Sequence, residues 1–238
     1  MLTLASTKQL KLHDGSFINY KLIKKYRRTI SLKITPKGLV VNAPILMANY
    51  KINQLLQKKS KWIQKKLLQS SISEELFKIQ NGENFKILNN EIVIILKAGV
   101  NNISIEADRC FISFKNLSDH LKLKKFFLIW LKEYALQHFT QRVEELCIKN
   151  NLKVKVTLVS NAKTRWGSCN SRKEIRLNWR LIQAPPFVID YVICHELSHL
   201  KFMNHSSDFW QQVQLLFPNY KEAELYLKEN GFKLYRID

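Results

Sequence analysis

The stretch from His195 to His205 reads HELSHLKFMNH, and the rest of the chain is best interpreted around it. Its first five residues have the pattern His-Glu-x-x-His, which on a helix places two imidazoles one turn apart on the same face. The side chain of Glu196 lies one position round the helix from His195, so it can flank the imidazoles and contact a water on a shared metal ion. This arrangement is typical of zinc hydrolases.

A third histidine, His205, follows six residues after the second, so three of the six histidines of the chain fall within this stretch. Catalytic zinc takes three protein ligands and leaves a fourth position to water. We expect the helix to break near Asn204, so that His205 can return towards the metal as the third ligand. Two alternatives are a capping role for His205 at the next helix and a competing ligand at Asp208, whose short side chain favours a supporting role.

This ligand set predicts the chemistry of the neighbouring residues. Glu196 is the expected general base, which takes a proton as water attacks a carbonyl and then delivers it to the leaving amine. A second donor usually shares the developing negative charge with the metal. Arg165, Asn178 and Tyr191 are candidates for this role, although Tyr191 could equally belong to the helix core and Arg165 to an ion pair.

The composition is that of a folded protein of one or two domains, with 238 residues, 46% hydrophobic and 24% charged. We find no apolar run long enough for a membrane helix and no signal-peptide pattern, which predicts a cytoplasmic protein. The four cysteines are widely spaced without a Cys-x-x-Cys pair, so we expect reduced thiols rather than disulfides or a thiolate zinc site.

The net charge of +20 is concentrated in the first third of the chain, where residues 1–70 hold 15 lysines and arginines against the single acid Asp14. A positive surface attracts nucleic acid and other polyanions through salt-sensitive forces. A solvated lysine-rich surface without a partner is the alternative interpretation.

The residue patterns predict an α+β fold. Residues 18–23, 29–34 and 39–43 are expected strands, with a turn at Thr35-Pro36-Lys37-Gly38, and one helix is expected from Ile52 to Leu68. Trp62 on this helix is expected in the core, with an exposed stacking surface as the alternative. Four further short strands are expected at residues 85–88, 91–97, 103–106 and 110–114.

A long helix capped by Ser118 or Asp119 should then run to Lys149. Strands are expected at residues 154–160, 163–169 and 175–179, and helices at 186–202, from Ser206 or Ser207, and at 219–230. We therefore expect a basic, β-rich N-terminal domain at residues 1–117, with one helix, and a second domain at residues 118–238.

Four blocks in order resemble the YgjP-like family of zinc metallopeptidases, which is related to the SprT-like and wider zincin proteases. They are Arg165-Trp166-Gly167-Ser168-Cys169, Ile175-Arg176-Leu177-Asn178, His195 to Leu200, and Asn204-His205-Ser206 with Phe209-Trp210. The resemblance implies a zincin-like helical domain with a small antiparallel sheet, one zinc ion on His195, His199 and His205, and Glu196 as catalytic base. It also implies that the hairpin from Arg165 to Asn178 lies beside the active-site helix, where an edge strand could hold an extended peptide.

Three functions are consistent with these features. The first is a zinc-dependent endopeptidase that cleaves extended or unfolded protein. The second is a nucleic-acid-associated protein whose basic N-terminal region binds DNA or RNA. Because SprT-like relatives act on DNA-bound proteins, this function can be combined with the first, as a protease that acts on DNA-bound proteins. The third is a non-catalytic module that zinc stabilises.

Overall fold

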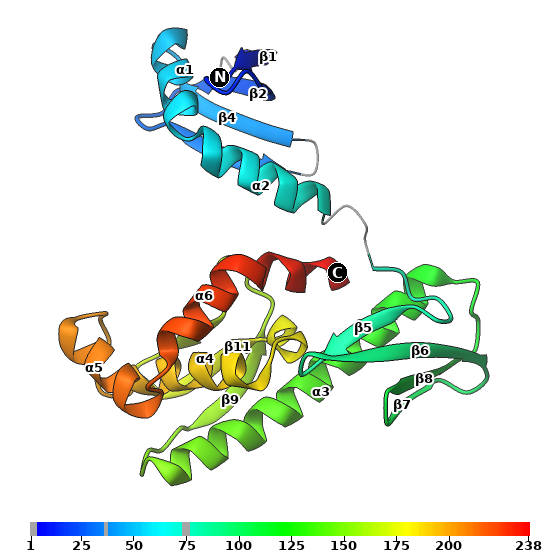
Figure 1. The fold of residues 1–238 in the computed structure, drawn as a ribbon. Coiled ribbons are helices and arrows are strands. Elements are labelled where there is room, and N and C mark those ends of the chain that lie inside the picture. The colour runs from blue at the N-terminus through cyan, green and yellow to red at the C-terminus, as the bar shows by residue number, and fades with distance from the viewer. Residues whose placement is uncertain (1–3, 36–37, 73–76) are drawn as a thin grey trace. The chain divides into compact units, whose positions relative to one another are not determined.

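In a computed structural model, which describes residues 4–35, 38–72 and 77–238, the chain divides into two compact units. The first is Met1–Leu76 and the second Phe77–Asp238 (Figure 1). Helices and strands are mixed in both units, so the α+β class is confirmed. Within the described residues, no helix combines the length and the apolarity that crossing a membrane requires.

The first unit is a four-stranded sheet with two helices. Its elements are β1 (Leu4–Lys11), β2 (Phe17–Lys25), β3 (Ser31–Thr35), β4 (Gly38–Pro44), α1 (Asn49–Lys58) and α2 (Ser60–Ile72). The strand order is β1-β2-β4-β3, with β2 and β4 parallel and the other pairs antiparallel. Alternate residues of β2 and β4 pack against apolar residues of both helices, including Ile52, Leu56 and Ile63.

In this unit two predictions are wrong, one strand was not predicted, and one expected turn lies partly outside the described residues. The single expected helix is two helices, because α1 ends at a cap on Lys59 and α2 begins at Ser60. Trp62 was expected in the core, but 43% of its surface is exposed, so that prediction is wrong. Strand β1 was not predicted, because its sequence does not alternate between apolar and polar residues. Pro36 and Lys37 of the expected turn lie outside the described residues.

The second unit begins with the sheet β5-β6-β8-β7 and the long helix α3 (His120–Lys149). The strands are β5 (Asn84–Ile87), β6 (Asn90–Ala98), β7 (Asn102–Glu106) and β8 (Arg109–Phe114). The expected cap is confirmed, since the Asp119 carboxylate accepts a hydrogen bond of 3.1 Å from the N–H of Lys122. The sheet packs on α3 through aromatic contacts, such as Phe85 with Phe127 at 5.2 Å between ring centroids.

These contacts place the division of the chain earlier than the sequence pattern suggested. The expected boundary between residues 117 and 118 falls inside the second unit, where β5–β8 and α3 share one hydrophobic core. The backbone of Leu88 also donates a hydrogen bond of 2.7 Å to Ile182, which joins this sheet to the C-terminal part of the unit. A change of secondary structure along the chain therefore does not coincide with a change of core.

The C-terminal part holds a three-stranded sheet and the shorter helices. Its elements are β9 (Val156–Ser160), β10 (Gly167–Cys169), β11 (Glu174–Asn178), η1 (Trp179–Gln183), α4 (Pro186–Ser198), α5 (Ser207–Leu216), α6 (Tyr220–Asn230) and η2 (Gly231–Ile237). The order is β10-β11-β9. The sheet was expected to be antiparallel but is mixed, because β9 pairs with β11 in parallel.

Candidate active site

Helix α4 forms the base of the candidate site. It begins with Pro186, whose fixed φ and missing N–H suit a first helical turn. Most of the helix is buried, so packing fixes its position in the core. A bidentate ion pair also connects α4 to α3, because the Arg142 guanidinium donates hydrogen bonds of 2.7 and 2.8 Å to the Asp190 carboxylate.

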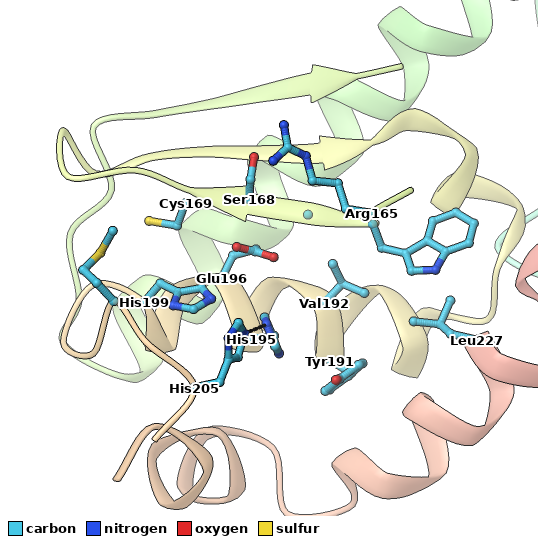
Figure 2. Close-up of a pocket in the computed structure, with 13 residues that line it drawn as sticks. Arg165, Ser168, Cys169, Tyr191, Val192, His195, Glu196, His199, His205 and Leu227 are labelled. Carbon is cyan, nitrogen blue, oxygen red and sulfur yellow. Dashed lines mark hydrogen bonds between the residues drawn. The ribbon is translucent and has the colours of Figure 1, made fainter. Parts of the chain in front are cut away.

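Three histidines converge at the C-terminal end of α4. His195 lies in its last turn, His199 is the residue at which the helix ends, and His205 lies in the loop before α5. One nitrogen from each ring falls within 4.8 Å of the others, and the Nε2 atoms of His195 and His205 are 3.2 Å apart (Figure 2). The helix ends four residues before the expected Phe202, which lets the chain turn back as soon as His199 is in place.

The two alternatives for His205 can be compared with this geometry. Ser206 is the residue that caps α5, because its hydroxyl accepts a hydrogen bond of 3.4 Å from the N–H of Phe209. Asp208 lies in the first turn of α5 and does not belong to the three-histidine cluster. His205 is therefore left facing the other two imidazoles.

The surroundings of His195 and His199 favour neutral imidazoles, the form that binds a metal. Burial and the two neighbouring imidazoles lower the pKa of His195 to about 4. Burial also lowers the pKa of His199, whose Nδ1 lies 3.0 Å from the carbonyl oxygen of Phe202. With the proton on Nδ1, this contact leaves the Nε2 lone pair of His199 available to a metal.

Phe209 supports all three imidazoles, a role that the sequence did not reveal. Its ring lies 4.5 Å from that of His199, 4.7 Å from His205 and 4.9 Å from His195 between centroids. Phe209 is fully buried. Its position three residues after Ser206, in the first turn of the helix that follows His205, is the signal that could have indicated the contact.

Glu196 lies beside the cluster, beneath strand β10. Only 4% of its surface is exposed, and its Oε2 atom is buried without a hydrogen-bond partner within the described residues. Burial raises the pKa of Glu196 to about 8, although the positive charge of Arg165 partly opposes this. Figure 2 shows the carboxylate between the imidazoles and the Ser168 segment.

These groups open into a pocket of about 450 Å³. Arg165 and Tyr191, two of the predicted charge-stabilising candidates, line it. The Tyr191 hydroxyl is already engaged, since it lies 3.1 Å from the Glu224 carboxylate as a hydrogen-bond donor. The remaining lining residues are Trp166, Gly167, Ser168, Cys169, Val192, His195, Glu196, His199, Met203, His205 and Leu227.

Asn178, the third candidate, lies behind the pocket wall and is not among the described residues that line it. It is fully buried, and its side-chain amide donates hydrogen bonds to the carbonyl oxygens of Ala162 at 2.7 Å and Arg165 at 3.3 Å. The structure thus gives this amide a backbone-supporting role in the segment that leads to Arg165.

Three convergent imidazoles next to a buried carboxylate, in an open pocket, define a class of metal-dependent hydrolases. The family model of the YgjP-like metallopeptidase domain matches residues 28–230, so the chain belongs to the YgjP-like family and is a metal-dependent peptidase. The family implies a divalent metal. The three imidazoles fit one by the convergence of their ring nitrogens within 4.8 Å.

Two solved structures are similar to part of this chain. Both are crystal structures of metallopeptidase zymogens. Jannalysin of Methanocaldococcus jannaschii is 24% identical, covers 39% of this chain and 95% of its own, and gives a TM-score of 0.34. Abylysin of Pyrococcus abyssi is 23% identical, covers 38% of this chain and 93% of its own, and also gives a TM-score of 0.34. No curated protein matches the sequence.

Proposed function

We propose that the chain is a zinc-dependent endopeptidase in which His195, His199 and His205 hold one zinc ion. The convergence of their three ring nitrogens within 4.8 Å carries this proposal. Three imidazoles and one open position are the ligand set of catalytic rather than structural zinc sites. When bound there, zinc would lower the pKa of a coordinated water and polarise the carbonyl of the scissile bond.

Glu196 moves the proton in this proposal. Its carboxylate is buried next to the histidines, and burial holds its pKa at about 8. A metal ion held by the neutral imidazoles would place a positive charge nearby, which would favour the ionised form of this carboxylate and lower that pKa. Glu196 can then take a proton from the attacking water and return it to the leaving amine near neutral pH.

Arg165 is the residue that we propose for the developing negative charge. It lines the pocket, its side chain is exposed, and its charge acts on Glu196. The amide of Asn178 is committed to two backbone carbonyls and the Tyr191 hydroxyl to Glu224. Neither group has a free donor directed at substrate, which leaves Arg165 as the better candidate.

We propose extended protein or peptide segments as substrates. Strand β10 lies at the end of the order β10-β11-β9 and lines the pocket over its whole length. An edge strand can add one further strand through main-chain hydrogen bonds. A peptide bound in this way would run past Glu196, and folded segments could not adopt the required extended form.

The test is cleavage of a proteome-derived peptide library by the wild-type protein and by Glu196→Gln, which keeps the shape of the side chain but cannot take the proton. We expect both proteins to bind one zinc ion and the variant to lose about 10²–10⁴-fold in rate. Glu174→Gln, a matched change on β11, should leave the rate unchanged. Equal cleavage by wild type and Glu196→Gln would contradict the mechanism, whereas zinc binding without any cleavage by wild type would favour the non-catalytic module.

A second candidate function rests on the face of the first sheet opposite to α1 and α2. Successive side chains of a strand point to opposite faces of the sheet, so the residues between the buried ones lie on that face. They include the exposed lysines Lys11, Lys21, Lys25 and Lys33. Phe17, 58% exposed, lies across from Lys11. Lysines attract phosphates and an exposed aromatic ring can stack with a base, so this face is suited to single-stranded nucleic acid.

Titration of a fluorescent single-stranded oligonucleotide at increasing salt tests this second function. Lys21→Glu with Lys33→Glu should weaken binding and reduce its dependence on salt. Lys51→Glu with Lys58→Glu on α1 makes the same charge change on other exposed lysines and should weaken binding less. No binding at low ionic strength would remove the candidate.

A further inference from the structure

The last segment of the chain, Gly231–Asp238, is built into the second unit. Leu234 and Ile237 are buried, and the Gln183 amide donates a hydrogen bond of 2.8 Å to the carbonyl of Leu234. The N–H of Phe77 donates one of 3.2 Å to the carbonyl of Arg236. The segment is therefore held by both apolar and backbone contacts.

A buried arginine anchors this segment. Arg180 is fully buried, and its guanidinium forms two hydrogen bonds with the Asp238 carboxylate, one of them 2.8 Å long from Nε to Oδ1. Its Nη2 also donates a hydrogen bond of 2.7 Å to Asn161. The guanidinium lies 4.8 Å from the centre of the Tyr235 ring, and a buried charge of this kind is costly to leave unpaired.

Tyr235 extends the contact towards the pocket. Its hydroxyl donates a hydrogen bond of 3.2 Å to the carbonyl of Ala162 and accepts one of 3.3 Å from the Asn178 amide. Its ring packs against that of Trp166 at 5.4 Å. The same tyrosine therefore contacts both ends of the segment Ala162–Trp166.

This segment ends in the wall of the active-site pocket, which Arg165 and Trp166 line. Trp166 also packs against the backbone of Gly231, where an added Cβ would lie 2.8 Å from the indole ring. The following residue, Gly167, contacts Glu196. A continuous set of contacts thus runs from Asp238 to the proton-transfer residue.

We propose that Gly231–Asp238 is a positioning element for the pocket wall, and that Tyr235 and Arg180 are the residues through which it acts. Neither residue lines the pocket, so they act through Arg165 and Trp166 rather than on substrate. The physical reason is that Ala162–Arg165 is a loop whose backbone carbonyls are held by Tyr235 and Asn178. Without these hydrogen bonds, Arg165 would sample positions away from the carbonyl that it faces in the proposed reaction.

Tyr235→Phe tests the proposal, because it removes the hydroxyl and keeps the ring that packs on Trp166. Tyr226→Phe is the matched control, a half-buried tyrosine of α6 that packs on Phe187. We expect amide hydrogen exchange in residues 161–167 to rise about tenfold in Tyr235→Phe, with α3 and α4 unchanged, and no such rise in Tyr226→Phe. Unchanged exchange in residues 161–167, or an equal rise across the whole unit, would overturn the proposal.

The kinetic consequence rests on the proposed peptidase function. Tyr235→Phe should lower kcat/KM about tenfold with unchanged zinc content and an unchanged rate for Tyr226→Phe. If the wild-type protein cleaves no peptide, the proposed function fails, but unchanged exchange in residues 161–167 would still overturn the proposal on its own. If exchange rises as expected while kcat/KM stays at the wild-type value, the segment is only structural and the proposal is overturned.

Discussion

Gly167 on β10 lies against the Glu196 side chain so closely that an added Cβ would be 2.7 Å from both Cγ and Cδ of the glutamate. Real Cβ atoms do not approach other heavy atoms to this distance. The absence of a side chain at Gly167 therefore allows Glu196 to occupy its position between the strand and the imidazoles.

Gly167→Ala should lower kcat/KM about 100-fold, because a displacement of about 1 Å at a reacting group has an effect of this size. Zinc content should not change, since the three heavy atoms nearest to the added Cβ all belong to Glu196 and none to a histidine. Gly99→Ala is the control, because its Cβ would also be crowded, at 2.6 Å from the Ser113 hydroxyl, but far along the chain from the site. Wild-type activity in Gly167→Ala would show that the contact does not position Glu196.

Arg165→Met and Tyr191→Phe distinguish the two candidates that line the pocket. The first change keeps the length of the side chain and removes its charge, and we expect kcat to fall about 10²-fold, as for loss of one charge-stabilising donor. Tyr191→Phe should change kcat less than about fivefold, because its hydroxyl is bonded to Glu224. Peptide hydrolysis at saturating substrate measures both, and the reverse order of effects would assign the role to Tyr191.

Removal of the metal should lower the thermal stability as well as the activity. Zinc at about 1,000 times its Kd contributes about 4 kcal/mol to a folded state that alone binds it. His205→Ala should abolish the rise in Tm that added zinc produces, since it removes one of the three ligands. His120→Ala, an exposed histidine at the start of α3, should retain it. Scanning calorimetry with and without a chelator provides the measurement.

Asp238→Ala should destabilise the protein by about 2–4 kcal/mol, because it leaves the buried charge of Arg180 without its carboxylate. Glu145→Ala removes a carboxylate from an exposed ion pair with Arg142 and should cost less than about 1 kcal/mol. Urea unfolding followed by circular dichroism compares the two variants. Equal losses would mean that burial of Arg180 does not matter.

Asp14 gives the first unit a dependence on acid pH. Hydrogen bonds from Ser16 and Gln64 lower the pKa of Asp14 from 3.8 to about 2. Because the folded pKa is the lower one, its stabilising contribution is present above about pH 4 and is lost as the pH falls to 2. Hydrogen exchange at residues 12–16 should therefore be faster in Asp14→Asn than in wild type at pH 6, and the difference should shrink towards zero as the pH falls through 2.

Several elements could be predicted from the sequence because short-range chemistry defines them. The residue pattern marked β5–β8, the Asp119 side chain marked the start of α3, and the helix expected at residues 219–230 matches α6 to within one residue. The end of α4 at Ser198 could not be predicted, because the residues up to Phe202 continue the apolar pattern. The contact of His205 with the Phe209 ring, 4.7 Å between centroids, could not be predicted either, because it depends on how α5 packs.

The sequence by itself determined the three histidines and the glutamate, since one stretch of eleven residues carries all four and helical geometry relates their side chains. Only the tertiary structure decided what surrounds them. Gly167 meets Glu196 and Arg180 meets Asp238 across 29 and 58 residues of chain, by contacts that no local pattern encodes. Contacts with distant residues also decide among the three candidates for stabilising the developing negative charge. Hydrogen bonds to such residues occupy the side chains of Asn178 and Tyr191, whereas Arg165 lines the pocket.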